Sequence, residues 1–427
     1  TKLAEVGQLG LSLSAPYGAN GSLVADSACS ATQLAIGQAS GSEMIGLDID
    51  GNIVNDGTII YFLLDASGIL SSTQAATYNG TAYIAVNAIR KDDMRPLVFK
   101  THDFGKTWEG ISNGMNPMGP VNAVREDHIT KGLLFAGTER EVYFSVDDGA
   151  NWQSLRMNMP ASSIRDLVIH ENDLVIGTHG RSIWILDDFS SLRELTKISN
   201  DAPHLFQPSL ATRVRFNMFA DTPLPPEEPT GENPPDGALI DYHLPTDTKE
   251  VSLEILDATN QLVNKFSSQD VLQYPDSTKL PHPTYWIRPL SKPSTKKGHQ
   301  RFVWNLRYAD PPGANRSYAI AAVLRNTPVG PVGPFVAPVT YGVRWSVDGV
   351  VDEKDIVVRL DPRSQLSDTD LKLQTALSMD VYNAYGELHN LREVALMKLE
   401  NKKLDRKKKS NLSKFVGSGD PNTVIFI

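Results

Sequence analysis

Alternating apolar and polar positions recur along most of the chain and predict β-strands rather than helices. The clearest alternation lies between residues 80 and 197, where the pattern repeats. The segment "LLFAGTEREVYFS" aligns with "DLVIGTHGRSIWIL", so that the Gly-Thr pairs at 137–138 and 177–178 stand 40 positions apart. Each segment ends in a short alternating strand, at 142–144 and at 183–185. The chain is therefore expected to contain repeated antiparallel sheets.

A short motif recurs inside these repeats. The segments "THDFGKTW" (101–108) and "SVDDGANW" (145–152) share the form S/T-x-D-x-G-x-x-W, here called a box, and their aspartates are 44 positions apart. Aspartate accepts backbone N–H bonds in a tight turn, glycine supplies positive φ, and tryptophan covers the strand pair. The predicted structural residues are Asp103, Gly105, Trp108, Asp147, Gly149 and Trp152.

A repeat of about 40 residues is typical of four-stranded propeller blades. We expect blades at roughly 80–115, 120–158 and 162–197, within a region from 66 to 197. Because propellers usually need four to eight blades to close a ring, about three blades make only a partial propeller.

The pattern changes after residue 197. Residues 198–236 contain the acidic, Pro-rich stretch "DTPLPPEEPTGENPPDG" and are predicted to be a linker. Alternating strands separated by turn residues then suit an Ig-like β-sandwich over 237–362, with Trp286, Trp304 and Trp345 expected in its core rather than as an exposed ligand platform.

One helix is predicted over 370–404, because apolar residues recur there every three or four positions. This stripe is expected to pack on the sandwich or on another helix, and a dimerising coiled coil is the alternative. It consists of Leu373, Leu377, Val381, Ala384, Leu388, Leu391, Ala395 and Leu399.

Residues 1–58 differ from the rest and are predicted to form a short α/β fragment. Small residues after Asp26 and Ser27 favour a helix, whose positive end would offer free N–H groups to a phosphate. The stretch "VADSACSAT" (24–32) resembles the nucleophile motif of alkaline phosphatases, and the resemblance covers about residues 5–55. It implies that Ser27 is a nucleophile and that Asp26 positions a phosphate-binding arginine.

That chemistry requires two zinc ions and usually a magnesium ion, which activate the serine and neutralise the leaving group. The sequence lacks both the Asp-Gly turn that precedes this motif in the family and its later histidine motifs. The alternative is that Ser27 only caps a helix. The N-terminal part is then a phosphatase fragment in a fused or chimeric chain, and no cofactor is expected.

The boxes resemble the Asp-box (BNR) repeats of sialidase-like and sortilin-like propellers, where the box is a structural turn on the rim. A sialidase-like glycoside hydrolase is one alternative, although its arginine cluster and Tyr/Glu pair cannot be assigned in this sequence. His179 and Arg181 in "GTHGRSIW" are candidates for ligand contact. The strands beyond 237 look like sandwich modules of large secreted bacterial proteins, which implies an extracellular, periplasmic or envelope location.

Charge and composition exclude some partners. The net charge of −9 and the pI near 5.5 disfavour nucleic acid, and no apolar run is long enough for a membrane span. The single cysteine, Cys29, excludes an internal disulfide. The leading hypothesis is a mainly β binding or assembly module for a protein or glycan ligand, without complete catalytic machinery. The alternative is a metal-dependent phosphomonoester hydrolase.

Overall fold

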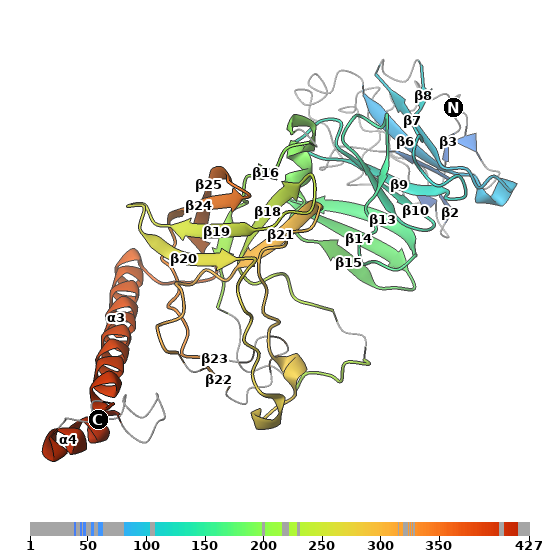
Figure 1. The fold of residues 1–427 in the computed structure, drawn as a ribbon. Coiled ribbons are helices and arrows are strands. Elements are labelled where there is room, and N and C mark those ends of the chain that lie inside the picture. Colours follow the sequence, from blue (N-terminus) through green and yellow to red (C-terminus); the bar gives the residue numbers. More distant parts are fainter. Residues whose placement is uncertain are drawn as a thin grey trace. The chain divides into compact units, whose positions relative to one another are not determined.

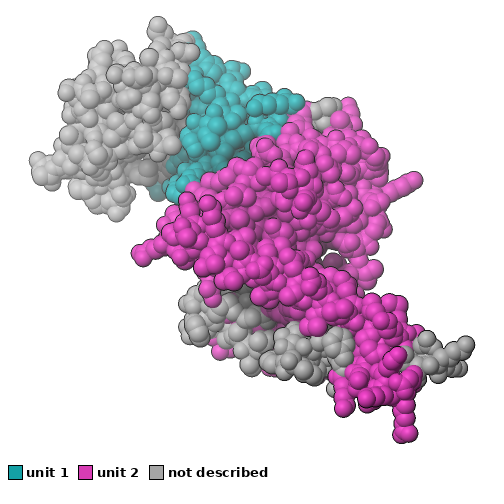
Figure 2. Space-filling view, turned by 90° about the vertical axis from the view of Figure 1, so that its left-hand side faces the viewer, with its two compact units in different colours: residues 1–197 teal, residues 198–427 magenta. Residues whose placement is uncertain are grey.

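The protein divides into two compact units, residues 1–197 and 198–427 (Figures 1 and 2). The computed structural model describes residues 81–102, 107–198, 201–215, 222–228, 231–314, 316–318, 323, 325, 327, 329–400 and 405–416, and the backbone of short strands between 38 and 62. Asp26, Ser27, Asp103 and Gly105 therefore lie outside the described residues.

Unit 1 is made of antiparallel strands, as the sequence predicts. Two small pairs come first, namely β1 (Gln38–Ala39) with β2 (Glu43–Met44) and β3 (Gly46–Leu47) with β4 (Ile53–Val54). The first larger sheet contains β5 (Ile59–Phe62), β6 (Ala82–Asn87), β7 (Leu97–Thr101) and β8 (Glu109–Gly110), with the 3-10 helix η1 (Ile89–Lys91) between β6 and β7.

Two more sheets follow in chain order. The second sheet contains β9 (Val121–Glu126), β10 (Leu134–Thr138), β11 (Val142–Ser145) and β12 (Gln153–Ser154). The third sheet contains β13 (Ser163–His170), β14 (Asp173–His179) and β15 (Ile183–Leu186), and the 3-10 helix η2 (Ser190–Lys197) follows it. In each sheet neighbouring strands are consecutive in the chain, so the sheets are simple meanders.

The second sheet is buried on both faces. Leu134, Ala136 and Tyr143 share a core with the first sheet. Phe135, Val142 and Phe144 face the opposite way and share a core with the third sheet. Because successive side chains of a strand point to opposite faces, a strand covered on both sides reads as a continuous apolar run, which explains "LLFAG" and "VYF".

Two sheets in unit 2 enclose one apolar core. The larger sheet has the order β17 (Ala211–Arg213), β25 (Val350–Leu360), β24 (Thr340–Val347), β19 (Val251–Leu256) and β20 (Leu262–Ser267). The smaller sheet has the order β16 (His204–Leu205), β18 (Ala238–Leu244) and β21 (Gly298–Trp304). A short pair, β22 (Ser317–Tyr318) with β23 (Val329–Gly330), and the 3-10 helices η3 (Ser277–Lys279) and η4 (Thr284–Trp286) lie in the connections.

Tryptophans fill this core. Trp304 and Trp345 are fully buried in this core. Trp286 is 7% exposed but lies outside the core, stacked on His282, so none of the three rings is a surface platform. Tyr242 of the smaller sheet lies 5.5 Å from Trp345 of the larger one, measured between ring centroids. The two sheets are therefore joined through aromatic contacts.

Part of the predicted linker, residues 198–236, forms strands instead. Residues 204–213 supply β16 and β17, and β17 pairs in parallel with β25. Leu205, Phe206 and Ala211 are buried, so these short strands are held by the apolar core of unit 2. The Pro-rich part lies further along, where the described residues between 222 and 235 are mostly exposed.

The predicted helix is present as α3 (Asp368–Leu399), followed by α4 (Arg406–Val416). A capping box starts it, in which the Ser367 hydroxyl oxygen accepts a hydrogen bond from the Asp370 N–H at 3.2 Å. The expectation that the apolar stripe packs on the sandwich is wrong for four of its members. Leu373, Leu377, Val381 and Leu391 are 59%, 56%, 71% and 58% exposed.

A different face of α3 is held by unit 2. The Tyr382 ring lies 6.3 Å from that of Tyr308, and the space beside Gly313 is filled by His389. Arg213 Nη2 also donates to Gln374 Oε1 at 3.2 Å. These contacts turn the apolar stripe away from the sheets. None of the described helices is long and apolar enough to cross a membrane.

Candidate functional site

The second box, Ser145–Trp152, forms a tight turn between β11 and β12. Asp147 Oδ1 accepts hydrogen bonds from the Asn151 N–H at 2.9 Å and from the Ser145 hydroxyl at 2.7 Å. Asp148 and Gly149 both have positive φ, 59° and 82°. A Cβ atom on Gly149 would lie 2.4 Å from Ile111 Cδ1. The turn therefore needs glycine both for its backbone and for its close approach to the first sheet.

The lowered pKa of Asp147 suits a carboxylate that accepts hydrogen bonds in a turn. Burial disfavours its charged form, but hydrogen bonds from Asn151 and Ser145 outweigh burial and hold the pKa of Asp147 below its ordinary value. A glycosidase general acid needs a raised pKa instead. The electrostatics of Asp147 therefore favour a turn aspartate over a proton donor.

Trp152 fastens the box to the segment that follows the first sheet. Its side chain is 3% exposed, and its indole Nε1–H donates to the Ile111 carbonyl at 2.5 Å. Its backbone N–H donates to the Asn113 carbonyl at 2.9 Å. Trp108 of the first box is only half-buried, and its indole nitrogen has no partner among the described residues.

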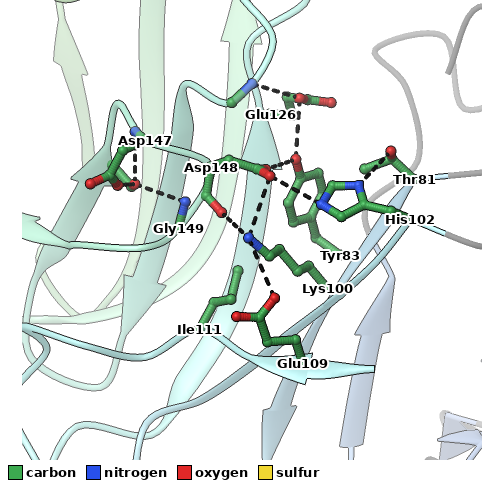
Figure 3. Close-up of polar contacts among 12 residues, drawn as sticks. Thr81, Tyr83, Lys100, His102, Glu109, Ile111, Glu126, Asp147, Asp148 and Gly149 are labelled. Carbon is green, nitrogen blue, oxygen red and sulfur yellow. Dashed lines mark hydrogen bonds and ion pairs between the residues drawn. The ribbon is translucent and has the colours of Figure 1, made fainter. Parts of the chain in front are cut away.

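A polar cluster surrounds Asp148 where the box meets the first sheet (Figure 3). We call it the Asp148 cluster, and it consists of Tyr83, Lys100, His102, Glu126 and Asp148. The Tyr83 hydroxyl donates to Asp148 Oδ1 and lies 3.4 Å from Glu126 Oε1. Lys100 Nζ is 3.4 Å and His102 Nε2 is 3.2 Å from Asp148 Oδ2.

The cluster joins strands that are distant in sequence. Tyr83 lies on β6, Lys100 on β7 and Glu126 on β9, whereas Asp148 belongs to the box turn. The sequence did not indicate this set, because its members are spread over 66 positions, 83–148. One signal was present, since Asp148 is an additional acid at the box position that Phe104 occupies in "THDFGKTW".

Burial dominates the proton affinities in this cluster. Burial raises the pKa of Tyr83, and the negative charges of Glu126 and Asp148 raise it further. Burial also raises the pKa of Glu126, while a hydrogen bond from the Gly132 N–H opposes the increase. Tyr83 therefore stays protonated and donates its one hydroxyl proton to Asp148, with the Glu126 carboxyl group beside it.

The other predicted site residues are not brought into this cluster. His179 and Arg181 are exposed in the turn between β14 and β15, where the Arg181 carbonyl accepts a hydrogen bond from the Trp184 indole at 2.9 Å. Across the described part of the chain, no group of three or more His, Cys, Asp or Glu side chains could hold a metal ion. Ser27 and Asp26 lie outside the described residues, so their roles and the associated zinc and magnesium stay predictions.

Comparison with models of protein families finds no match, and comparison with curated proteins finds none either. Among solved structures, the chain is similar to the GH74 xyloglucanase from Xanthomonas campestris, with 20% identity, a TM-score of 0.22, and coverage of 26% of this chain and 19% of that chain. It is similar to YCF48 bound to D1 peptide, with 18% identity, a TM-score of 0.19, and coverage of 25% and 32%.

A third similar structure is an ancestral GH74 enzyme, with 12% identity, a TM-score of 0.22, and coverage of 69% of this chain and 30% of that chain. The chain thus spans less than a third of the length of each of these proteins. These likenesses are too distant to assign a substrate or a ligand.

Replacing Trp152 by Ala should lower the free energy of unfolding of unit 1 by roughly 3–5 kcal/mol, the usual cost of removing a buried aromatic side chain. Trp108→Ala should cost clearly less, because Trp108 is half-buried and its indole has no partner among the described residues. Urea unfolding followed by circular dichroism measures both. A loss below about 1 kcal/mol for Trp152→Ala would show that the box is not fastened to the first sheet.

Glu126→Gln should change how stability depends on pH. Because the pKa of Glu126 is raised in the folded state, its contribution to stability is fully present below its unfolded pKa and is lost as the pH rises through the folded pKa. The variant should therefore be more stable than the wild type at pH 8 and lose this advantage near pH 4.

Urea unfolding at several pH values tests this expectation. A Glu126→Gln difference that grows as the pH falls would contradict the assignment.

Proposed function

We propose that the chain is a non-catalytic binding or assembly module, built from propeller-type blades with Asp-box turns and an Ig-like sandwich. The four-stranded meanders stacked face to face in unit 1 support the propeller interpretation. The two sheets around one core support the sandwich. The resemblance of the boxes to those of secreted propellers supports an extracellular or envelope location.

The observation that carries an assembly function is the exposed stripe of α3. Leu373, Leu377, Val381 and Leu391 are each more than half exposed, although they line one face of a regular 32-residue helix. Apolar residues scattered singly on a surface are ordinary, but a continuous apolar stripe marks an interaction surface.

The spacing of the stripe fits a second copy of the same helix. From Leu377 to Leu391 the apolar residues follow steps of four, three, four and three positions, which is the heptad pattern of a coiled coil. In an antiparallel pair the acidic residues Asp380 and Glu387 would face each other. A parallel pair separates these acidic residues, whereas Arg392 is only 13% exposed and pairs with Glu393 of its own chain. The avoided repulsion between acidic residues is what favours a parallel dimer.

The polar groups of unit 1 support a non-catalytic role. Asp147 organises a turn, and the members of the Asp148 cluster contact one another across strands of two sheets. His179 and Arg181, exposed at a hairpin turn, are the residues we propose for contact with a protein or glycan ligand. Phosphomonoester hydrolysis by Ser27 with zinc and magnesium stays the alternative.

Sedimentation equilibrium of the full chain tests assembly through α3. We expect a concentration-dependent dimer, and Leu377→Lys with Val381→Lys should raise its dissociation constant at least about tenfold, because charges would enter the apolar seam. The control is Ala376→Lys with Asn383→Lys, which adds the same charge at exposed positions of α3 outside the stripe.

The control variant should dimerise like the wild type. A wild-type chain that stays monomeric, or a dimer that both double variants weaken equally, would contradict the proposal.

A further inference from the structure

The third sheet carries an uncovered aliphatic face. Val168, Val175 and Ile185 lie opposite one another on β13, β14 and β15, and Gly177 lies opposite Ile183. Val168, Ile183 and Ile185 are 51%, 70% and 55% exposed, and Val175 is half-buried. We call this set the outer face of the third sheet.

In the second sheet the equivalent face is covered by a neighbouring sheet. In β10 and β11 the pairs are Phe135 with Phe144 and Gly137 with Val142, in the same register as Val175 with Ile185 and Gly177 with Ile183. Phe135 and Val142 are fully buried and Phe144 is 7% exposed. Their cover is the inner face of the third sheet, including Ile164 and Leu167.

The two glycines at the centre of these faces differ in one respect. A Cβ on Gly137 would lie 2.6 Å from Ile164 Cγ2, so the next sheet presses a β-branched side chain onto this glycine. A Cβ on Gly177 would approach nothing closer than 3.6 Å, at the Asp166 carbonyl oxygen. Gly177 therefore occupies the position that receives a covering side chain, while nothing described in unit 1 presses on it.

We propose that the outer face of the third sheet packs against the outer face of a second copy of this chain. Gly177 and Ile183 lie directly opposite each other on neighbouring strands. A twofold axis between them places Ile183 of each copy on Gly177 of the other, as a symmetric interface requires. The covering group is then a β-branched isoleucine, as it is at Gly137.

Charged side chains border this face. Asp166 of β13 is in register with Gly177 and is 58% exposed, and its Oδ1 forms an ion pair of 2.6 Å with Arg125 Nη2. His179 and Arg181 are exposed at the end of β14 and β15. An apolar centre with a charged rim is the usual anatomy of a protein interface. This surface is separate from the α3 stripe and gives the chain a second self-contact, so a wild-type chain that uses both associates beyond a dimer unless the two contacts share one twofold axis.

The test uses the full chain carrying Leu377→Lys and Val381→Lys, so that association through α3 is removed. Sedimentation equilibrium should still show a weak dimer. Ile183→Lys with Ile185→Lys should abolish it, and Gly177→Ala should weaken it about tenfold, since an added methyl group would collide with the partner's isoleucine. Gly177→Ala should leave the unfolding free energy of the chain unchanged, because it meets no close atom.

Two control variants separate folding from association. Leu262→Lys places a charge on a 56% exposed strand position of unit 2 and should leave the residual dimer intact. Gly137→Ala should lower the stability of unit 1, because its methyl group meets Ile164.

This inference would be overturned if no residual dimer formed. It would also be overturned if neither Gly177→Ala nor the double variant Ile183→Lys with Ile185→Lys changed that dimer. Either result would leave the α3 proposal standing. Failure of the α3 proposal shows separately, as a dimer that Leu377→Lys with Val381→Lys does not weaken.

Discussion

The fastening of the second box onto the first sheet is the contact on which the arrangement of unit 1 depends. A single meander cannot bury both of its faces, so each sheet needs a neighbour held at the correct position. Trp152 supplies two hydrogen bonds to the segment at 111–113, and Asp148 accepts from Tyr83, 65 positions earlier in the chain. The charged and aromatic residues Tyr83, Asp148 and Trp152 thus hold sheets together. Their contacts are those of a structural scaffold.

A scaffold of stacked layers leaves its last layer exposed unless something covers it. The second sheet of unit 1 is buried on both faces, whereas the third sheet presents Ile183 and Ile185 to solvent. In unit 2 the same situation arises on α3, where one face contacts residues 308–313 and the apolar stripe is left open. Both surfaces are regular and aliphatic. Each belongs to an element that lacks a covering element among the described residues.

Local patterns in the sequence predicted those features that depend on local physics. The alternating strands, the box turn at 145–152, the buried tryptophans and the helix near 370–399 were all readable from spacing and residue type. The Asp148 cluster was not, because strand pairing over long separations decides which side chains meet. Periodicity located the α3 stripe but could not say what covers it. The strands β16 and β17 are two and three residues long, too short to show a period.

Asp148 couples the box to the first sheet, and a double-mutant cycle between Tyr83→Phe and Asp148→Gly measures that coupling directly. Glycine suits the positive φ of position 148, so the variant removes the carboxylate without straining the turn. We expect the two changes to be non-additive in the unfolding free energy of unit 1 by roughly 1 kcal/mol or more. Additivity within about 0.3 kcal/mol would show that the two residues act independently and that the cluster does not hold the sheets together.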